Sequence, residues 1–171
     1  QYQSILKAQN PQLRPERACK LLKRRMQDYK KLGFDKEIDL KLNYIEPLFH
    51  LLSDIGTYFG IENANTLEII EELTRRGKFT YRSGELLKEA VSFIYILRLR
   101  LHSFYGEPKE RIDLSGMSGY ILKPEEKITL QNYEKFILRP LYKCIHAITN
   151  DNKTPADFFQ PCDLFLIAFQ E

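Results

Sequence analysis

Cysteines are few, and their placement argues against two common ways of stabilising a small protein. Cys19, Cys144 and Cys162 are widely spaced, odd in number and without a CxxC pair. Disulfide frameworks use paired cysteines in secreted proteins, and structural zinc sites use closely spaced ligand pairs. The pattern therefore favours reduced thiols in a cytoplasmic protein.

Glycine, proline and long apolar runs are also scarce. Eight glycines and eight prolines among 171 residues are too few for a β-rich protein dense in turns. No run approaches the roughly 18 to 20 apolar residues that span a bilayer, because Arg98 and Arg100 end the longest candidate. The first ten residues hold no signal-peptide segment, and since there is no initiator Met we expect further sequence upstream of Gln1.

What is present is the composition of a folded globule. Apolar residues make up 43% of the chain and aromatic residues 12%, which suits one domain with a sizeable core and a tail. Residues 1–36 hold ten Lys/Arg against three Asp/Glu, a charge of +7. The rest of the chain holds 16 against 20, or −4, which gives the net charge of +3. The electrostatic asymmetry therefore lies in the N-terminal segment.

This basic segment predicts an amphipathic helix that starts after Pro15 and ends at Gly33. Its charged face includes Arg17, Lys20 and Arg24, and such faces bind nucleic acid or anionic lipid in some proteins. A solvated helix surface is the simpler interpretation, because no glycine-rich or aromatic platform accompanies the charges. Nucleic acid is therefore a disfavoured partner.

One long helix, Leu86–Tyr105, is the element around which we expect the rest of the chain to pack. Its apolar residues recur at steps of three and four, and others such as Ile96 and Leu99 lie outside that face. A helix that is apolar nearly all round needs neighbours on several sides, so it should be central. Thr80 is the expected N-cap, and Gly106 the expected end.

The remaining segments predict further helices and one long loop. An extended connector is expected at Phe34–Asn43, followed by a helix at Tyr44–Phe59 and a short helix that Thr66 caps and Gly77 ends. A long loop is expected at Glu107–Lys127. Thr129 then opens a helix at Leu130–Ile148, and Pro140 inside it should kink the helix or split it in two. In the short helix, Leu67, Ile70 and Leu73 are expected to face inward.

The predicted fold is all-α, a single helical bundle of five to six helices around a central apolar helix, with no convincing strand. Residues 1–13 are expected to form an arm or the end of a preceding domain. Residues 14–150 form the bundle, and residues 151–171 either pack on it or lead to a next domain.

The usual catalytic signatures are absent from the chain. It contains none of the patterns GxGxxG, GxxxxGK[ST], HExxH and GxSxG. His50, His102 and His146 lie on predicted helices without carboxylates at ligand spacing, so structural or surface roles are expected. An independent enzyme is therefore the least favoured function, and no metal site is expected.

Three short motifs carry a family resemblance. They are Asp-Leu-Lys at residues 39–41, Asn-Thr-Leu-Glu at 65–68 and Leu-Arg-Leu-Arg at 97–100, with a proline-led helix between the first two. From about Pro15 to Ala147 the chain resembles the putative nucleotidyltransferase substrate-binding domain. In bacteria that helical domain follows a nucleotidyltransferase domain related to the N-terminal part of protein-PII uridylyltransferase.

The resemblance implies the accessory half of a nucleotidyltransferase-like protein. The metal-binding carboxylates of the family belong to the preceding domain, in a Gly-Ser followed by an Asp-x-Asp, and nothing in this chain matches that pattern. Mg²⁺ and nucleotide would therefore bind in the parent protein, and no cofactor is expected in these residues. The implied partner is a nucleotidyltransferase domain upstream in the same chain, on which this domain packs to help form the substrate cleft. A protein-interaction or regulatory module without nucleotide chemistry is the alternative.

Arg98 is the first candidate site residue, because it falls near the apolar stripe of the central helix. A buried charge without compensation costs several kcal/mol. Arg98 therefore either pairs with an internal carboxylate, Asp39 or Asp54, or forms an anion site with Lys41 and Arg100 that faces the nucleotide of the partner domain.

Thr66 completes the candidate site residues. It is expected to cap its helix, and the alternative is that the N-terminus of this helix holds an anion. Asp39 and Lys41 are interpreted as salt-bridge partners that set the register of the chain, and the anion site is the alternative role for Lys41. A cluster on one flank of the central helix is either an interface or ordinary packing: Tyr95, His102 and Tyr105.

Overall fold

The computed structural model describes residues 37–61, 65–115 and 119–142, together with Lys20 and Arg24. Most of these residues are helical, and no helix among them is long and apolar enough to cross a membrane. Lys20 and Arg24 are helical and exposed. The three cysteines, the arm at residues 1–13, the rest of the predicted basic helix and the chain after Tyr142 lie outside the described residues.

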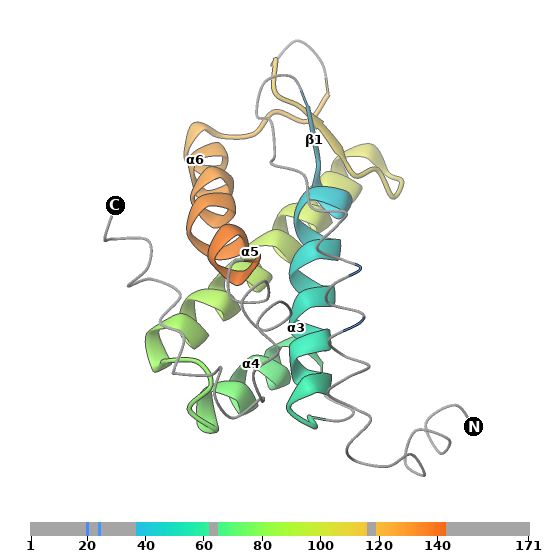
Figure 1. Cartoon of the computed structure of the whole chain (residues 1–171). Helices are drawn as coiled ribbons and strands as arrows, with labels where there is room; N and C mark the ends of the chain where they lie inside the picture. Colours follow the sequence, from blue (N-terminus) through green and yellow to red (C-terminus); the bar gives the residue numbers. More distant parts are fainter. Residues whose placement is uncertain (1–19, 21–23, 25–36, 62–64, 116–118, 143–171) are drawn as a thin grey trace, which may run out of the picture.

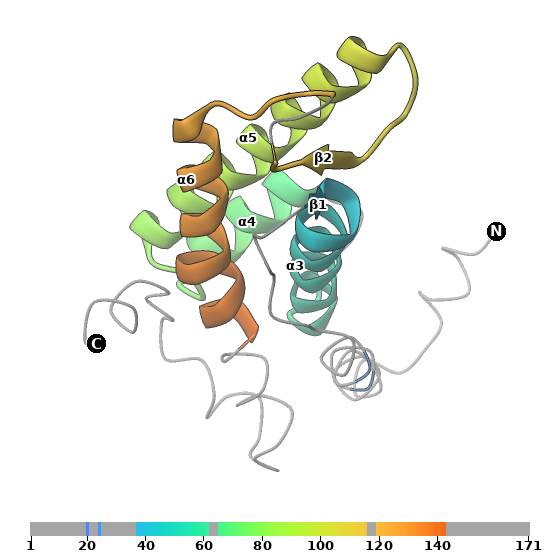
Figure 2. The same cartoon turned by 90° about the horizontal axis from the view of Figure 1, so that it is seen from above.

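The described residues form four α-helices, two π-helical turns and a two-strand sheet. In chain order these are β1 (Glu37–Asp39), η1 (Lys41–Ile45), α3 (Glu46–Tyr58), α4 (Thr66–Arg75), α5 (Tyr81–Tyr105), β2 (Arg111–Asp113), α6 (Pro124–Tyr133) and η2 (Glu134–Leu138). Helix α5 crosses behind α3 and α6, and α4 packs on both α3 and α5 (Figures 1 and 2). The fold is thus a mostly helical bundle, and the further helices that the sequence predicts fall on segments outside the described residues.

Helix α5 occupies the predicted place and has the predicted ends. The Thr80 hydroxyl accepts a hydrogen bond from the backbone N–H of Ser83 at 3.1 Å, and Gly106 ends the helix at a φ of 67°. Its inward stripe is buried: Leu87, Ala90, Val91, Ile94, Leu97 and Leu101. The expectation of neighbours all round is wrong for one flank, because Ile96 and Leu99 are 49% and 65% exposed.

The helix predicted at Tyr44–Phe59 consists of two elements, the π-helical turn η1 followed by α3. The Tyr44 ring is buried, and its hydroxyl donates a hydrogen bond to the carbonyl oxygen of Leu130 at 3.0 Å. Gly60 and Gly77, at φ values of 70° and 66°, follow α3 and α4 as predicted. The start of the bundle is therefore tied directly to α6.

Helix α4 begins differently from the prediction. Its N-cap is Asn65 rather than Thr66, which is the first helical residue. The Asn65 side chain accepts from the N–H of Glu68 at 3.1 Å, and the Glu68 carboxylate accepts from the N–H of Asn65 at 2.9 Å. Leu67 is 38% exposed, so its predicted inward position is wrong, and Ile69 is buried in its stead.

A two-strand antiparallel sheet contradicts the prediction that the chain has no strand. The paired residues are Glu37 with Asp113, Ile38 with Ile112, and Asp39 with Arg111. The two isoleucines face inward and are buried, whereas their neighbours are partly or fully exposed. The predicted extended connector at Phe34–Asn43 does contain β1.

The segment Glu107–Lys127 is not the continuous loop that the sequence predicts. It contains β2, and α6 begins at Pro124, where a proline suits the first helical turn. After α6 the chain continues through η2 into residues 139–142, which are helical and include Pro140. A proline excludes the ordinary hydrogen bond to the residue four earlier. The wider turn η2 immediately before Pro140 is therefore the form that the predicted kink takes.

One hydrophobic core joins all of these elements. From the first half of the chain it takes Ile38, Leu40, Tyr44, Leu48, Leu51, Leu52, Ile55, Ile70 and Leu73, and from the second half Ile112, Leu130, Ile137, Leu138 and Leu141. Helix α5 adds its buried stripe, and both strands and α6 contribute residues as well. The described elements therefore share one core.

Candidate functional site

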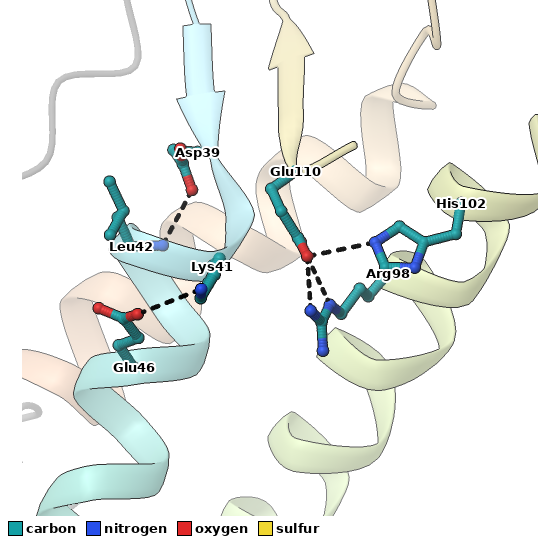
Figure 3. A network of polar contacts seen from close by, with 7 residues as sticks. All are labelled: Asp39, Lys41, Leu42, Glu46, Arg98, His102 and Glu110. Carbon is teal, nitrogen blue, oxygen red and sulfur yellow. Dashed lines mark hydrogen bonds and ion pairs between the residues drawn. The ribbon is translucent and has the colours of Figure 1, made fainter. Parts of the chain in front are cut away.

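Arg98 and His102 lie one turn apart on α5, and both point at Glu110, the residue before β2 (Figure 3). Arg98 donates to Oε1 of Glu110 from Nε at 2.9 Å and from Nη2 at 2.5 Å. Nε2 of His102 lies 3.2 Å from the same oxygen. These three residues are called the Glu110 cluster below. The hydrogen bond to Glu110 raises the pKa of Arg98 above its usual value.

The carboxylate of this cluster is satisfied on one side only. Its Oε1 meets Arg98 and His102, whereas Oε2 is buried and has no hydrogen-bond partner among the described residues. The backbone carbonyl of Glu110 accepts from the N–H of Leu40 at 2.8 Å, next to β1. The sheet therefore holds the backbone of Glu110, while one of its carboxylate oxygens is buried without a donor, which is unfavourable.

Lys41 belongs to the opposite side of the same junction. It lies at the start of η1, and Figure 3 shows its side chain on the η1 side of Glu110, with Arg98 and His102 on the α5 side. Its Nζ is 3.7 Å from Oε1 of Glu46, and the lysine is half exposed. A long, exposed ion pair of this kind holds a side chain weakly. Lys41 is therefore available as a second cation.

Asp39 is not the partner of Arg98 or of Lys41. Its Oδ1 accepts from the N–H of Leu42 at 2.9 Å, and its Oδ2 lies 3.7 Å from Nε of Arg111 across the sheet. It thus caps the turn that follows β1 and pairs with the neighbouring strand. Arg98 does have an internal carboxylate partner, but that partner is Glu110 rather than the expected Asp39 or Asp54.

Arg100 points away from the Glu110 cluster, towards α6. Its Nη1 donates to Oε1 of Glu126 at 2.7 Å. Glu126 is buried, and its Oε2 accepts from the N–H of Lys123 at 3.1 Å at the start of α6. Both oxygens of this carboxylate are used, so Arg100 serves to anchor α6 to α5.

Thr66 lines a separate groove of about 570 Å³ between α3, α4 and α5. None of the described residues that line this groove is charged, and the rings of Phe49 and Tyr95 meet there edge to face with centroids 4.9 Å apart. The capping box of Asn65 and Glu68 already occupies N–H groups at this end of α4 and adds a negative charge. These features make the groove a poor place for an anion.

The three residues predicted to cluster on one flank of α5 serve three different contacts. Tyr95 packs on Phe49, and His102 belongs to the Glu110 cluster. The Tyr105 hydroxyl accepts from the N–H of Tyr120 at 2.9 Å, which ties the segment before α6 to the end of α5. Each of the three therefore has a separate contact within the domain.

Of the four candidate anion-binding residues, the structure brings two to the same junction. Arg98 contacts Glu110, and Figure 3 draws Lys41 on the other side of that residue with its amine directed at Glu46, whereas Arg100 and Thr66 lie at other contacts. Nothing in the sequence pattern singles out Glu110, because the polar segment around it has no periodicity. The one signal in the sequence is Arg98 itself, because a half-buried arginine must pair with a carboxylate to offset the cost of its burial.

The Glu110 cluster can bind charge, but it has no arrangement for covalent chemistry. It offers two donors from Arg98, one ring nitrogen from His102 and one carboxylate. No group of three or more His, Cys, Asp or Glu side chains in the described ranges is placed to hold a metal ion. The two donors of Arg98 support recognition of a charged group.

A comparison with protein families finds one match, to the model described as "putative nucleotidyltransferase substrate binding domain", over residues 12–119. The matched range includes β1 to β2 and the whole Glu110 cluster, and it ends before α6. No curated protein and no solved structure gives a significant match.

Proposed function

The chain belongs to the family of the putative nucleotidyltransferase substrate binding domain, and from this premise we propose that it is a non-catalytic helical accessory domain. It packs on a nucleotidyltransferase domain upstream in the same chain and helps to form the substrate cleft of that domain. The family match carries the proposal, because its description ties these residues to nucleotidyltransferase substrates. Mg²⁺ and the catalytic carboxylates belong to the partner domain.

Arg98 is the main anion-binding residue in this proposal. The planar guanidinium group suits the oxygens of a phosphate, and the Arg98 side chain is 31% exposed, so that a ligand can reach it. Lys41 on the other side of Glu110 is the second cation. Arg100 and Thr66 contribute less, since they lie at other contacts.

Nucleotide binding to the complete protein tests the role of Arg98. Isothermal titration calorimetry with ATP and with UTP, each with Mg²⁺, compares Arg98→Met with the unsubstituted protein. Loss of a charge-assisted hydrogen bond to phosphate weakens binding by roughly tenfold or more. Arg75→Met, which removes an exposed arginine at the end of α4, is the control and should bind normally. Equal affinities of Arg98→Met and the unsubstituted protein would overturn this role.

A protein-interaction or regulatory module is the second candidate function. It is favoured by Ile96 and Leu99, which are exposed on the outer flank of α5, because exposed large apolar side chains mark contact surfaces. An experiment that separates the two candidate functions replaces both residues by Ser and measures the assembly state of the complete protein by analytical ultracentrifugation. Weaker assembly with unchanged nucleotide affinity supports the interaction module, and weaker nucleotide binding supports the accessory domain.

A further inference from the structure

We infer that the Glu110 side chain occupies, in the free domain, the place of a phosphate group, and that a phosphorylated ligand binds by displacing it from Arg98 and His102. The inference rests on the proposed function, because it takes Arg98 to be the anion-binding residue. It adds the class of ligand, a phosphate-bearing molecule such as a nucleotide, and an internal competitor for that ligand.

The Arg98 guanidinium is not used in the way that its shape allows. Its Nε and Nη2 donors lie on one edge, which matches two oxygens of a carboxylate or a phosphate. In the free domain both donors converge on Oε1 of Glu110, and His102 approaches the same oxygen. A phosphate offers more oxygens, so each of the three donors can have an acceptor of its own.

Other glutamates that accept hydrogen bonds from arginine in this fold have donors for both carboxylate oxygens. Each uses both carboxylate oxygens: Glu72 with Arg75, Glu134 with Arg139, and Glu126 with Arg100 and the N–H of Lys123. Glu110 alone leaves a buried carboxylate oxygen without a donor among the described residues. A buried acceptor without a donor raises the free energy of the folded state. Moving this carboxylate into water therefore recovers part of the free energy that is lost when its ion pair with Arg98 breaks.

The side chain of Glu110 can leave without unfolding the junction. Its backbone carbonyl stays bonded to the N–H of Leu40, and the next residue, Arg111, pairs with Asp39 in the sheet. Only side-chain torsions need to change. Rotamer changes of this kind are small and fast compared with rearrangement of a strand or helix.

Displacement also changes the charge at the site. With Glu110 in place, its carboxylate neutralises Arg98, and the cluster presents little net charge to a ligand. With the carboxylate gone, the donors of Arg98 are free to meet an incoming anion, and Lys41, which only a long ion pair joins to Glu46, is the second cation of the junction. The cationic site is therefore complete only when a ligand strong enough to compete with Glu110 arrives.

Substitution of Glu110 by Gln in the complete protein tests the inference. Gln keeps the shape of the side chain but removes the charge that competes for Arg98. Affinity for ATP and for inorganic phosphate, measured by calorimetry, should rise about five- to tenfold, the difference between a charged and a neutral hydrogen-bond acceptor. Glu72→Gln removes an arginine-paired carboxylate far from the site and should leave the affinity unchanged.

Two further variants keep the outcomes distinct. In Glu110→Gln with Arg98→Met the gain in affinity should vanish, because the donor edge is missing. If Arg98→Met weakens binding but Glu110→Gln does not strengthen it, the displacement is wrong and the proposed function stands; if Arg98→Met binds normally, both fail. If the Gln variant does not fold, Glu110→Asp replaces it in the test. The shorter aspartate side chain reaches Arg98 less well, so this variant protein should also bind phosphate more tightly than the unsubstituted protein.

Discussion

Gly84 of α5 lies against Thr74 of α4 so closely that any side chain at residue 84 would overlap the Thr74 hydroxyl. An ideal Cβ on Gly84 would also lie 3.3 Å from both Cβ and Cγ2 of Thr74. Moving the hydroxyl aside would break the hydrogen bond that it donates to the carbonyl of Ile70 at 2.8 Å. The absence of a side chain at residue 84 therefore sets how closely the two helices approach.

Gly84→Ala should destabilise the domain, although alanine is the better helix former. The overlap with Thr74 costs about 1–3 kcal/mol, as overpacking does in other cores, against a propensity gain of ~1 kcal/mol. In a Thr74→Ala background the hydroxyl is gone, and the same Gly84→Ala change should be neutral or stabilising. Urea unfolding of the four proteins measures both effects, and an equal loss in both backgrounds would contradict the steric explanation.

Tyr44→Phe should lower the free energy of unfolding by ~1 kcal/mol, the net contribution of one hydrogen bond. It removes the buried hydroxyl that donates to the carbonyl of Leu130, and it leaves the aromatic ring in place. Tyr81→Phe, at a residue that is 76% exposed, is the matched control and should have no measurable effect. Similar losses in both variants would mean that the bond between η1 and α6 is not the cause.

Glu126→Ala should cost more stability than Glu126→Gln. Glu126 accepts from Arg100 and also from the N–H of Lys123, where it completes the start of α6. Glutamine retains an acceptor for that N–H, whereas alanine leaves the helix start and the arginine unpaired, at a cost of about 1–2 kcal/mol. Thermal unfolding of the two variants checks this order, and equal losses would show that the charge, which both variants lack, matters more than the cap.

Glu72 should respond to acid well below the usual range. Its hydrogen bonds from Arg75 and Arg76 lower its pKa from 4.5 to about 2. Because the folded-state pKa is the lower one, this carboxylate stabilises the fold above pH 4.5, and its contribution is lost as the pH falls towards 2. A carbon-13 NMR titration of the Glu72 carboxyl should show a midpoint at about pH 2.

The control for this titration is the neighbouring Glu71→Gln, which removes a carboxylate that pairs with Lys88 and should leave the Glu72 midpoint in place. Glu72→Gln should make the free energy of unfolding less sensitive to pH between 4.5 and 2. A titration midpoint near pH 4.5 for Glu72 would show that Arg75 and Arg76 do not lower the pKa of its carboxyl group.

The parts of the fold that the sequence predicted are those with local causes. Thr80, Gly106, Gly60 and Gly77 mark helix ends through their own backbone preferences, and all four stand where they were expected. The apolar stripe of α5 is a local pattern as well. These features need no knowledge of the partner segments.

The features that the sequence pattern did not predict depend on distant partners. A strand of three residues has too few positions for alternation to stand out, and the partner of Ile38 is Ile112 on another segment. Glu110 becomes the partner of Arg98 only because pairing of the strands brings it to α5. Leu67 fits the helical pattern, yet it is 38% exposed, whereas Ile69 is buried and lies against Gly56 of α3.

The long-range ties of η1 to α6 and of β1 to β2 determine the order in which this domain can mature during synthesis. Tyr44 and Leu130 are 86 residues apart, so the core cannot close until the ribosome has released nearly the whole domain. A nascent chain that stops after α5 already has α4 to pack on this helix, but it lacks β2 and α6, which complete the core. Such an intermediate leaves part of the core uncovered, and exposed apolar surface of this kind is prone to aggregation.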